Sequence, residues 1–174
     1  NKDGKKIIGS DELSKLKKWR DAFIHESTSM YEFGRSENLL FSINSLIPFS
    51  HWVTPEKAPK RFDTRFYIAV APKGHTGQHD GNESVDSIWI NPQQALDDCL
   101  SGKRNIIFPT RLNLEQLNQS KTVAEAINNA KNSKIVTVTP LIEKLDEGIF
   151  LTIPKEAGYG EVKEFINLQR ASIE

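Results

Sequence analysis

The spacing of the hydrophobic residues changes along this chain of 174 residues, and this change constrains the fold more than any other feature. Between Ser10 and Ile24 apolar side chains recur every three or four residues, as in an amphipathic helix. Between Arg65 and Ala71 large apolar side chains fall at every second position, as in a half-buried strand. A helical period returns after Asn91-Pro92, a typical N-cap followed by a first-turn proline. A chain that uses both periods predicts a mixed α+β fold.

Local signals predict the remaining elements. Thr122 and Glu125 have the T-x-x-E spacing of a capping box, which predicts a helix after Thr122. Apolar and β-branched runs bounded by Pro, Gly or Asn predict strands. The predicted further helices are Ser29–Arg35, Thr110–Asn118 and Thr122–Lys131, and the predicted further strands are Leu39–Val53 (broken by Pro48), Val85–Ile90, Lys134–Thr139 and Gly148–Ile153.

The same periods predict which side chains form the core. Phe66, Ile68 and Val70 share one face of their strand, and we expect them to be buried with Trp89 and Leu96. The helix after Pro92 is predicted to turn a stripe toward this core, formed by Ala95, Leu96, Cys99 and Leu100. Cys99 is interpreted as a small buried hydrophobic residue rather than a nucleophile.

Composition excludes several classes of protein. The 23 basic and 23 acidic residues balance, so net charge alone does not hold this chain on nucleic acid or on an anionic membrane. No apolar run approaches the roughly 20 residues of a membrane span, and no signal peptide follows Asn1. One cysteine excludes a disulfide framework and a cysteine-based zinc site. We therefore predict a cytoplasmic protein with neither a nucleic-acid nor a membrane partner.

Two stretches contain residues suited to chemistry. The first runs from His75 to Glu83 and includes Asp80; it is interpreted either as a solvated loop or as a site where Asp80 or Glu83 holds a hard cation. The second runs from residue 51 to residue 66 and mixes aromatic residues, arginines and prolines. Its candidate substrate-binding residues are Trp52, Arg61, Phe62 and Arg65.

Two interpretations of the second stretch remain open. Guanidinium groups match phosphate oxygens and an aromatic face can stack on a base, so the stretch can bind a phosphorylated ligand. Alternatively, Trp52 and Phe62 belong to the core, and Arg61 and Arg65 pair with Asp63 or nearby acids. No P-loop, dinucleotide-binding glycine motif, zinc-protease motif or nucleophile elbow is present in the sequence.

Residues 51–67, HWVTPEKAPKRFDTRFY, closely resemble a segment of one branch of the Nudix hydrolases, which includes coenzyme A diphosphatase-like enzymes. The resemblance runs from about residue 10 to residue 160. It is supported by Asp80-x-x-Glu83 with Trp89, Pro92 and Ala95-Leu96 behind it, by Phe108-Pro109-Thr110, and by Ala157-Gly158-Tyr159-Gly160. The family's defining motif, G-x5-E-x7-R-E-U-x-E-E-x-G-U with U a bulky aliphatic residue, does not occur in these 174 residues.

The resemblance implies a single partial Nudix domain over residues 1–174, with the later strands and helices of an α/β/α sandwich. Its parts would be a helical segment over residues 1–36, core strands and a helix over 37–108, and C-terminal helices and strands over 109–174. In this branch the defining motif would lie upstream of the first helix, so Asn1 would begin just after the catalytic helix. We expect an upstream segment of the reading frame to encode that motif.

The resemblance also implies an activity. Nudix enzymes hydrolyse a diphosphate with the help of Mg²⁺ or Mn²⁺, which glutamates on one helical face hold; here the substrate would be nucleotide- or coenzyme A-like. We expect the isolated chain to be inactive without those glutamates, with Glu83 as a candidate base and Asp80 and Glu83 as candidate metal ligands. The alternatives are a natural module that lacks the motif and binds a ligand or partner without turnover, and a purely structural fragment. Oligomeric state is not predicted.

Overall fold

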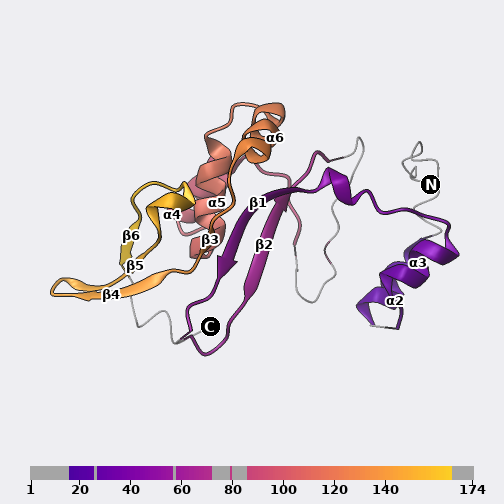
Figure 1. The fold of residues 1–174 in the computed structure, drawn as a ribbon, viewed down its shortest axis with the longest axis horizontal. Coiled ribbons are helices and arrows are strands. Elements are labelled where there is room, and N and C mark those ends of the chain that lie inside the picture. Colours follow the sequence, from indigo (N-terminus) through magenta and orange to yellow (C-terminus); the bar gives the residue numbers. More distant parts are fainter. Residues whose placement is uncertain (1–15, 26, 57, 72–78, 80–85, 166–174) are drawn as a thin grey trace. The chain divides into compact units, whose positions relative to one another are not determined.

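The computed structural model describes residues 16–25, 27–56, 58–71, 79 and 86–165 (Figure 1). The chain divides into two compact units, Asn1–Ser45 with Gly74–Ile88 and Leu46–Lys73 with Trp89–Glu174, and each is described by itself. Helices and both parallel and antiparallel strand pairs are present, which confirms the predicted α+β class. The assignment of all 174 residues to one domain stays a prediction.

The described part of the first unit contains two short helices, α2 (Lys17–Ile24) and α3 (Met30–Ser36), followed by a 3-10 turn at Ile43–Ser45. The predicted start of the first helix at Ser10 lies outside the described residues. Ser29 caps α3, because its Oγ accepts from the Glu32 backbone N–H at 3.2 Å while the Glu32 carboxylate accepts from the Ser29 N–H. This capping box confirms the predicted second helix.

Aromatic side chains hold the two helices of the first unit together. The ring of Phe33 lies 5.4 Å from that of Trp19, 5.6 Å from Phe23 and 6.0 Å from Phe41. Glu37 accepts a hydrogen bond from the Trp19 indole N–H, and this bond lowers the pKa of the Glu37 carboxyl. Tilted and edge-to-face ring pairs add to the burial of apolar area, so this cluster provides the small core of the unit.

The second unit contains a three-stranded sheet in the order β2-β1-β3, with β1 at Ile47–Val53, β2 at Asp63–Ile68 and β3 at Thr137–Val138. β1 and β2 are antiparallel, and β1 and β3 are parallel. The predicted strands Leu39–Val53 and Lys134–Thr139 were too long. The first is strand only where it pairs with β2 or β3, and the second only where it pairs with β1.

A second sheet in this unit is an antiparallel meander, β4-β5-β6 (Figure 1). Its strands are β4 (Leu141–Leu145), β5 (Gly148–Thr152) and β6 (Lys163–Phe165). β5 matches the predicted strand Gly148–Ile153, whereas β4 and β6 were not predicted. The sequence of β4, LIEKL, does not alternate apolar with polar residues, so it lacks the pattern that predicts a half-buried strand, and all five residues are exposed.

Three helices of the second unit follow the predicted order: α4 (Pro92–Leu100), α5 (Phe108–Asn118) and α6 (Val123–Asn132). The Asn91 side chain caps α4 by accepting from the Gln93 N–H at 2.8 Å. Thr122 caps α6 by accepting from the Glu125 N–H, but the Glu125 carboxylate binds the N–H of Lys121 instead of that of Thr122. One of the two hydrogen bonds of the predicted capping box is therefore present, and the other is made to the backbone N–H one residue earlier.

The core of the second unit lies between its first sheet and α5. Trp52, Leu112, Val138 and Ile153 are its buried hydrophobic residues, and Phe66, Phe108 and Tyr159 pack against them. Thr64, Phe66 and Ile68 are half-buried on one face of β2 while its other residues are exposed, which confirms the alternation but not full burial. Among the described residues β2 pairs with β1 alone, so it lies at the edge of this sheet.

Three predicted core residues are exposed. Val70 is 63% exposed because β2 ends at Ile68, and Trp89 is 69% exposed because residues 86–90 form no strand. The predicted strand Val85–Ile90 was therefore wrong over its described part. Leu100 is 86% exposed, because Ala95 and Asp98 form the buried face of α4. Cys99 is half-buried, with a free thiol.

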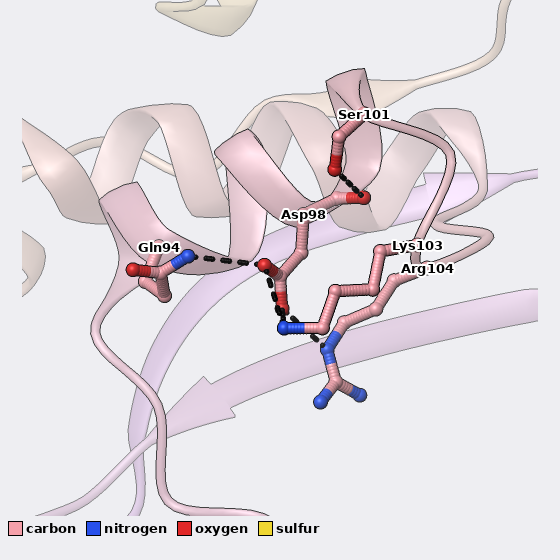
Figure 2. Close-up of polar contacts among 5 residues, drawn as sticks. All are labelled: Gln94, Asp98, Ser101, Lys103 and Arg104. Carbon is pink, nitrogen blue, oxygen red and sulfur yellow. Dashed lines mark hydrogen bonds and ion pairs between the residues drawn. The ribbon is translucent and has the colours of Figure 1, made fainter.

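Asp98 is a buried carboxylate that sequence reasoning did not predict, and it joins α4 to the loop that follows it (Figure 2). Gln94 Nε2 lies 3.0 Å and Lys103 Nζ 3.1 Å from Oδ1, and Arg104 Nε lies 3.0 Å from Oδ2. Burial alone would raise the pKa of Asp98, but hydrogen bonds from Lys103, Gln94 and Arg104 outweigh it and lower the pKa. A buried carboxylate with this many donors is a structural clamp.

Replacement of Asp98 by Asn is expected to lower the unfolding temperature of the second unit, since Lys103 and Arg104 then lose their counter-charge. The pKa of Asp98 is lower in the folded state than in the unfolded state. The ionised carboxylate therefore stabilises the fold fully above the unfolded-state pKa, and this stabilisation is lost as the pH falls through the folded-state pKa. Thermal melts at pH 7 and at about pH 3 should therefore differ less for Asp98→Asn than for the parent chain. If the unfolding temperature changes equally between the two pH values in both proteins, the stabilising role of ionised Asp98 is contradicted.

No helix of the described ranges is long and apolar enough to cross a membrane.

Candidate functional site

The hairpin of β1 and β2 carries the sequence-predicted substrate residues and distributes them over two faces. In its register Trp52 lies opposite Thr64, whereas His51 lies opposite Arg65. Successive side chains of a strand point to opposite faces of the sheet. Trp52 and Thr64 therefore share one face, and His51 and Arg65 share the other.

The first face contains a mostly apolar cavity of about 550 Å³. Its walls come from both hairpin strands, from the start of α5 and from the end of the β3–β4 connection. The aromatic residues that line it are Trp52, Phe62, Phe66 and Phe108, with Ile107, Pro109, Pro140 and Leu151 beside them. Its volume lies within the range of small-molecule sites, roughly 300–1,000 Å³.

Trp52 forms the floor of this cavity and is part of the core, with 3% of its surface exposed. Its ring lies 5.8 Å from that of Phe108 and 5.4 Å from that of Tyr159, and its indole N–H donates to the Tyr159 hydroxyl at 3.2 Å. Burial raises the pKa of Tyr159. The tryptophan is thus held in one orientation, with its position fixed by packing and by one hydrogen bond.

Phe62 and Lys60 lie at the exposed side of the cavity. Phe62 is 55% exposed, and the Lys60 ammonium lies 5.0 Å from the centre of its ring. Thr54 and Thr64 are the other polar side chains that line the cavity. A rigid aromatic floor, an exposed ring and one cation fit a ligand with an apolar or planar part and a negative group.

The opposite face carries a polar cluster around His51. Its Nδ1 lies 2.8 Å from Thr137 Oγ1 and its Nε2 lies 2.6 Å from Asp63 Oδ1, so one imidazole joins all three strands of the sheet. Arg65 Nη1 lies 3.5 Å from Asp63 Oδ1. The hydrogen bond from His51 is the main cause of the lowered pKa of Asp63, and the charge of Arg65 adds to it.

Arg61 closes the turn of the hairpin. Its Nε donates to the Thr54 carbonyl at 3.2 Å, and the backbone N–H of Phe62 donates to Thr54 Oγ1 at 3.1 Å. Of the four candidate residues, the structure therefore brings together Trp52 and Phe62 at the cavity. It places Arg61 at the turn and Arg65 beside Asp63 on the other face.

A polar network that was not predicted from the sequence fixes the position of Trp52, which lines the cavity. Asn113 Oδ1 accepts from Ser50 Oγ at 2.9 Å and from the Tyr159 hydroxyl at 2.7 Å. Asn113 and Ser50 are buried, so these bonds fix β1 against α5 and hold Trp52 through Tyr159. The segment Ala157–Gly160 was noted in the sequence, but nothing in it reveals that Tyr159 returns to strand β1.

The residues described do not form a divalent-metal site. Asp80 and Glu83, the candidate ligands, lie outside them. Across the described ranges, no three His, Cys, Asp or Glu side chains converge. Asp63 is committed to His51 and Arg65, and Asp98 to Lys103 and Arg104. Mg²⁺ and Mn²⁺ require several converging oxygen donors, which this part of the chain does not provide.

Comparison with known proteins gives two curated relatives. The chain is 26% identical over 161 residues to "Acyl-coenzyme A diphosphatase NUDT19" of Xenopus laevis, a match that covers 88% of this chain and 42% of that protein. It is 28% identical over 90 residues to "Putative nudix hydrolase 7" of Caenorhabditis elegans, covering 51% of this chain and 30% of that protein. These similarities support a Nudix-like relationship.

The matched regions span less than half the length of either relative. No family model matches the chain. No solved structure matches it significantly. The α+β class is consistent with a Nudix-like fold.

Proposed function

We propose that this chain is the C-terminal portion of a metal-dependent diphosphate hydrolase of the Nudix type, and that its cavity binds the apolar or planar part of a nucleotide- or coenzyme A-like substrate. One observation carries the proposal: the stretch that resembles the Nudix hydrolases is also the stretch that lines the cavity. Residues 51–67, the stretch with the specific resemblance, also supply Trp52, Lys60 and Phe62 to the cavity. The relationship to two proteins named as Nudix hydrolases supports it.

Each candidate residue has a proposed role. Trp52 provides a fixed apolar floor, and Phe62 stacks on or covers the ligand from the exposed side. Lys60 attracts a phosphate or carboxylate near Phe62. Arg61 and Arg65 are proposed to bind phosphate oxygens, because a guanidinium group offers paired donors. For this they would have to exchange their present partners, Thr54 and Asp63.

The proposed Mg²⁺ or Mn²⁺ would supply charge neutralisation at the diphosphate and activation of water. Asp80 and Glu83 are proposed to support that site, with Glu83 as base or ligand. The main carboxylates are proposed to lie in an upstream segment, since the chain contains no E-x-x-E-E run. The described residues would then bind and orient the substrate, and the chain alone would not turn it over.

The substrate role of the cavity is tested by binding. Replacement of Phe62 by Ala is expected to weaken binding of an acyl-coenzyme A to the 174-residue chain by about 3- to 10-fold, the loss of one aromatic contact of about 0.5–1.5 kcal/mol. Isothermal titration at pH 7 without metal measures the dissociation constant. Tyr67→Ala is the matched control, because Tyr67 is 49% exposed on the opposite face of the same hairpin.

The control should bind as the parent chain does. Equal losses in both variants, or an unchanged dissociation constant for Phe62→Ala, would contradict the assignment of the cavity as the substrate site. Lys60→Glu should weaken acyl-coenzyme A further than it weakens an uncharged thioester of the same acyl chain, since only the former carries phosphates for Lys60 to attract.

The second candidate function is a module that binds a ligand or partner without turnover. It requires only the cavity of the β1–β2 hairpin as a binding site. Tight acyl-coenzyme A binding together with no hydrolysis by any longer natural form of the chain would support it. A cytoplasmic location and the absence of a nucleic-acid or membrane partner stay predictions under either function.

A further inference from the structure

The cavity of the β1–β2 hairpin follows one strand along its length. Phe62, Thr64 and Phe66 all line it, and they occupy every second position of a segment that begins just before β2. The Thr54 N–H donates to the Phe62 carbonyl at 2.9 Å, so the pairing of the hairpin continues to Phe62. Because each residue of a strand adds about 3.3 Å, this wall extends over roughly 13 Å. A long wall of this kind fits a linear group.

The polar groups beside this wall are largely bound to other parts of the protein. The Thr54 hydroxyl accepts from the Phe62 N–H at 3.1 Å, and the Thr54 carbonyl accepts from Arg61. The Trp52 indole N–H donates to the Tyr159 hydroxyl. Several described lining residues are prolines, which have no backbone N–H to offer: Pro55, Pro109 and Pro140. The wall therefore offers few hydrogen bonds to a ligand.

A purine base and an alkyl chain respond differently to such a wall. A buried purine exchanges the hydrogen bonds of its ring nitrogens with water for whatever the protein supplies, and each bond left unmade weakens binding. An alkyl chain has no such bonds to lose, and each buried methylene strengthens binding. Among the described lining residues, Thr64 and Lys60 are the remaining polar side chains, and Lys60 lies at the exposed side beside Phe62. The cavity therefore favours a chain.

We propose that this cavity takes the acyl chain of an acyl-coenzyme A and leaves the adenine base outside it. This inference rests on the proposed function, in which either the apolar or the planar part of the substrate occupies the cavity. The chain lies along Phe62, Thr64 and Phe66, and Leu151 of β5 lines the same space. The polar arm that leads to the phosphates leaves past Lys60 at the exposed side.

The length of the acyl chain is the variable that tests this proposal. Isothermal titration of the 174-residue chain without metal compares coenzyme A, acetyl-coenzyme A and octanoyl-coenzyme A. Full burial of one methylene corresponds to an affinity gain of about fourfold, so the six additional methylenes of the octanoyl group should tighten binding at least about 50-fold over acetyl. The octanoyl thioester of N-acetylcysteamine, which has no nucleotide, should also bind. Adenosine 3′,5′-bisphosphate should not displace that thioester.

Two variants distinguish a bound chain from a bound base. Thr64→Val replaces a hydroxyl of the wall with a methyl group, so it should tighten octanoyl-coenzyme A about twofold. A base that used this hydroxyl would bind more weakly instead. Leu151→Phe fills part of the cavity, so it should weaken octanoyl-coenzyme A at least about fivefold more than acetyl-coenzyme A. Thermal melts measure whether both variants fold.

The inference is overturned if affinity does not depend on chain length, if adenosine 3′,5′-bisphosphate displaces the thioester, or if Thr64→Val weakens octanoyl-coenzyme A. The proposed function would then stand with the base in the cavity, provided that Phe62→Ala still weakens binding. The same gain with chain length in folded Leu151→Phe as in the parent places the acyl chain elsewhere and also overturns the inference. If octanoyl-coenzyme A does not bind at all, the proposed function itself is contradicted.

Discussion

Replacement of Leu112 by Ala is expected to lower the free energy of unfolding of the second unit by about 2–5 kcal/mol. Leu112 is 2% exposed and lies with Trp52, Val138 and Ile153 in the core between α5 and the first sheet. The loss combines the lost transfer of the isobutyl group from water with the cavity left in a well-packed core. Urea denaturation followed by tryptophan fluorescence measures it.

Leu100→Ala is the matched control, since Leu100 ends α4 with 86% of its surface exposed. It should change the free energy of unfolding by no more than about 0.5 kcal/mol. Similar losses for the two variants would contradict the placement of α5 against the sheet. Ile68→Ala is expected to cost about 2 kcal/mol, less than Leu112→Ala, because Ile68 is only half-buried.

Helix positions could be predicted from the sequence because their signals are local. Asn91-Pro92, Ser29 with Glu32, and Thr122 with Glu125 each define a helix start through contacts within one turn. The structure confirms all of these starts within one or two residues. Strand lengths were less predictable, because a strand ends where its partner ends. β3 is only two residues long, although the β-branched run around it is longer.

The predictions of burial failed where contacts with distant residues, such as ion pairs, decide which side chain is buried. Leu100 and Trp89 are apolar but exposed, whereas Asp98 is charged and buried. Asp98 is buried because Lys103 and Arg104 return to it from the following loop. Periodicity weighs only hydrophobicity, so it predicted the burial of Ala95 correctly but included Leu100 and missed Asp98. An acidic residue followed five and six residues later by two basic ones was the available signal.

The candidate site was predicted in part. The stretch 51–67 was singled out, and two of its four candidate residues, Trp52 and Phe62, meet at one cavity. The alternation of strand side chains separates Arg65 from them, and this separation could have been derived from the register once Trp52 was paired with Thr64. Phe108, Tyr159 and Asn113 could not have been assigned, because each is brought to β1 from more than 50 residues away.

We propose that this chain binds the substrate, while the catalytic carboxylates lie in an upstream segment. A longer natural form of the chain that includes an upstream E-x-x-E-E segment is expected to hydrolyse acyl-coenzyme A in the presence of Mg²⁺ at least about 10³-fold faster than the 174-residue chain. This is a small part of the roughly 10⁶-fold or larger acceleration typical of enzymes. Within the longer form, Glu83→Gln tests the proposed role of that loop residue, and a large fall in turnover with unchanged folding would support it.

The most direct measurement is therefore the rate of acyl-coenzyme A hydrolysis by residues 1–174 alone, with Mg²⁺, at a concentration where titration shows the ligand to be bound. We predict binding without turnover, and no change in rate when Mg²⁺ is replaced by a chelator. Magnesium-dependent hydrolysis by the 174-residue chain, with the diphosphate bond cleaved over many turnovers, would contradict the placement of the catalytic carboxylates outside it.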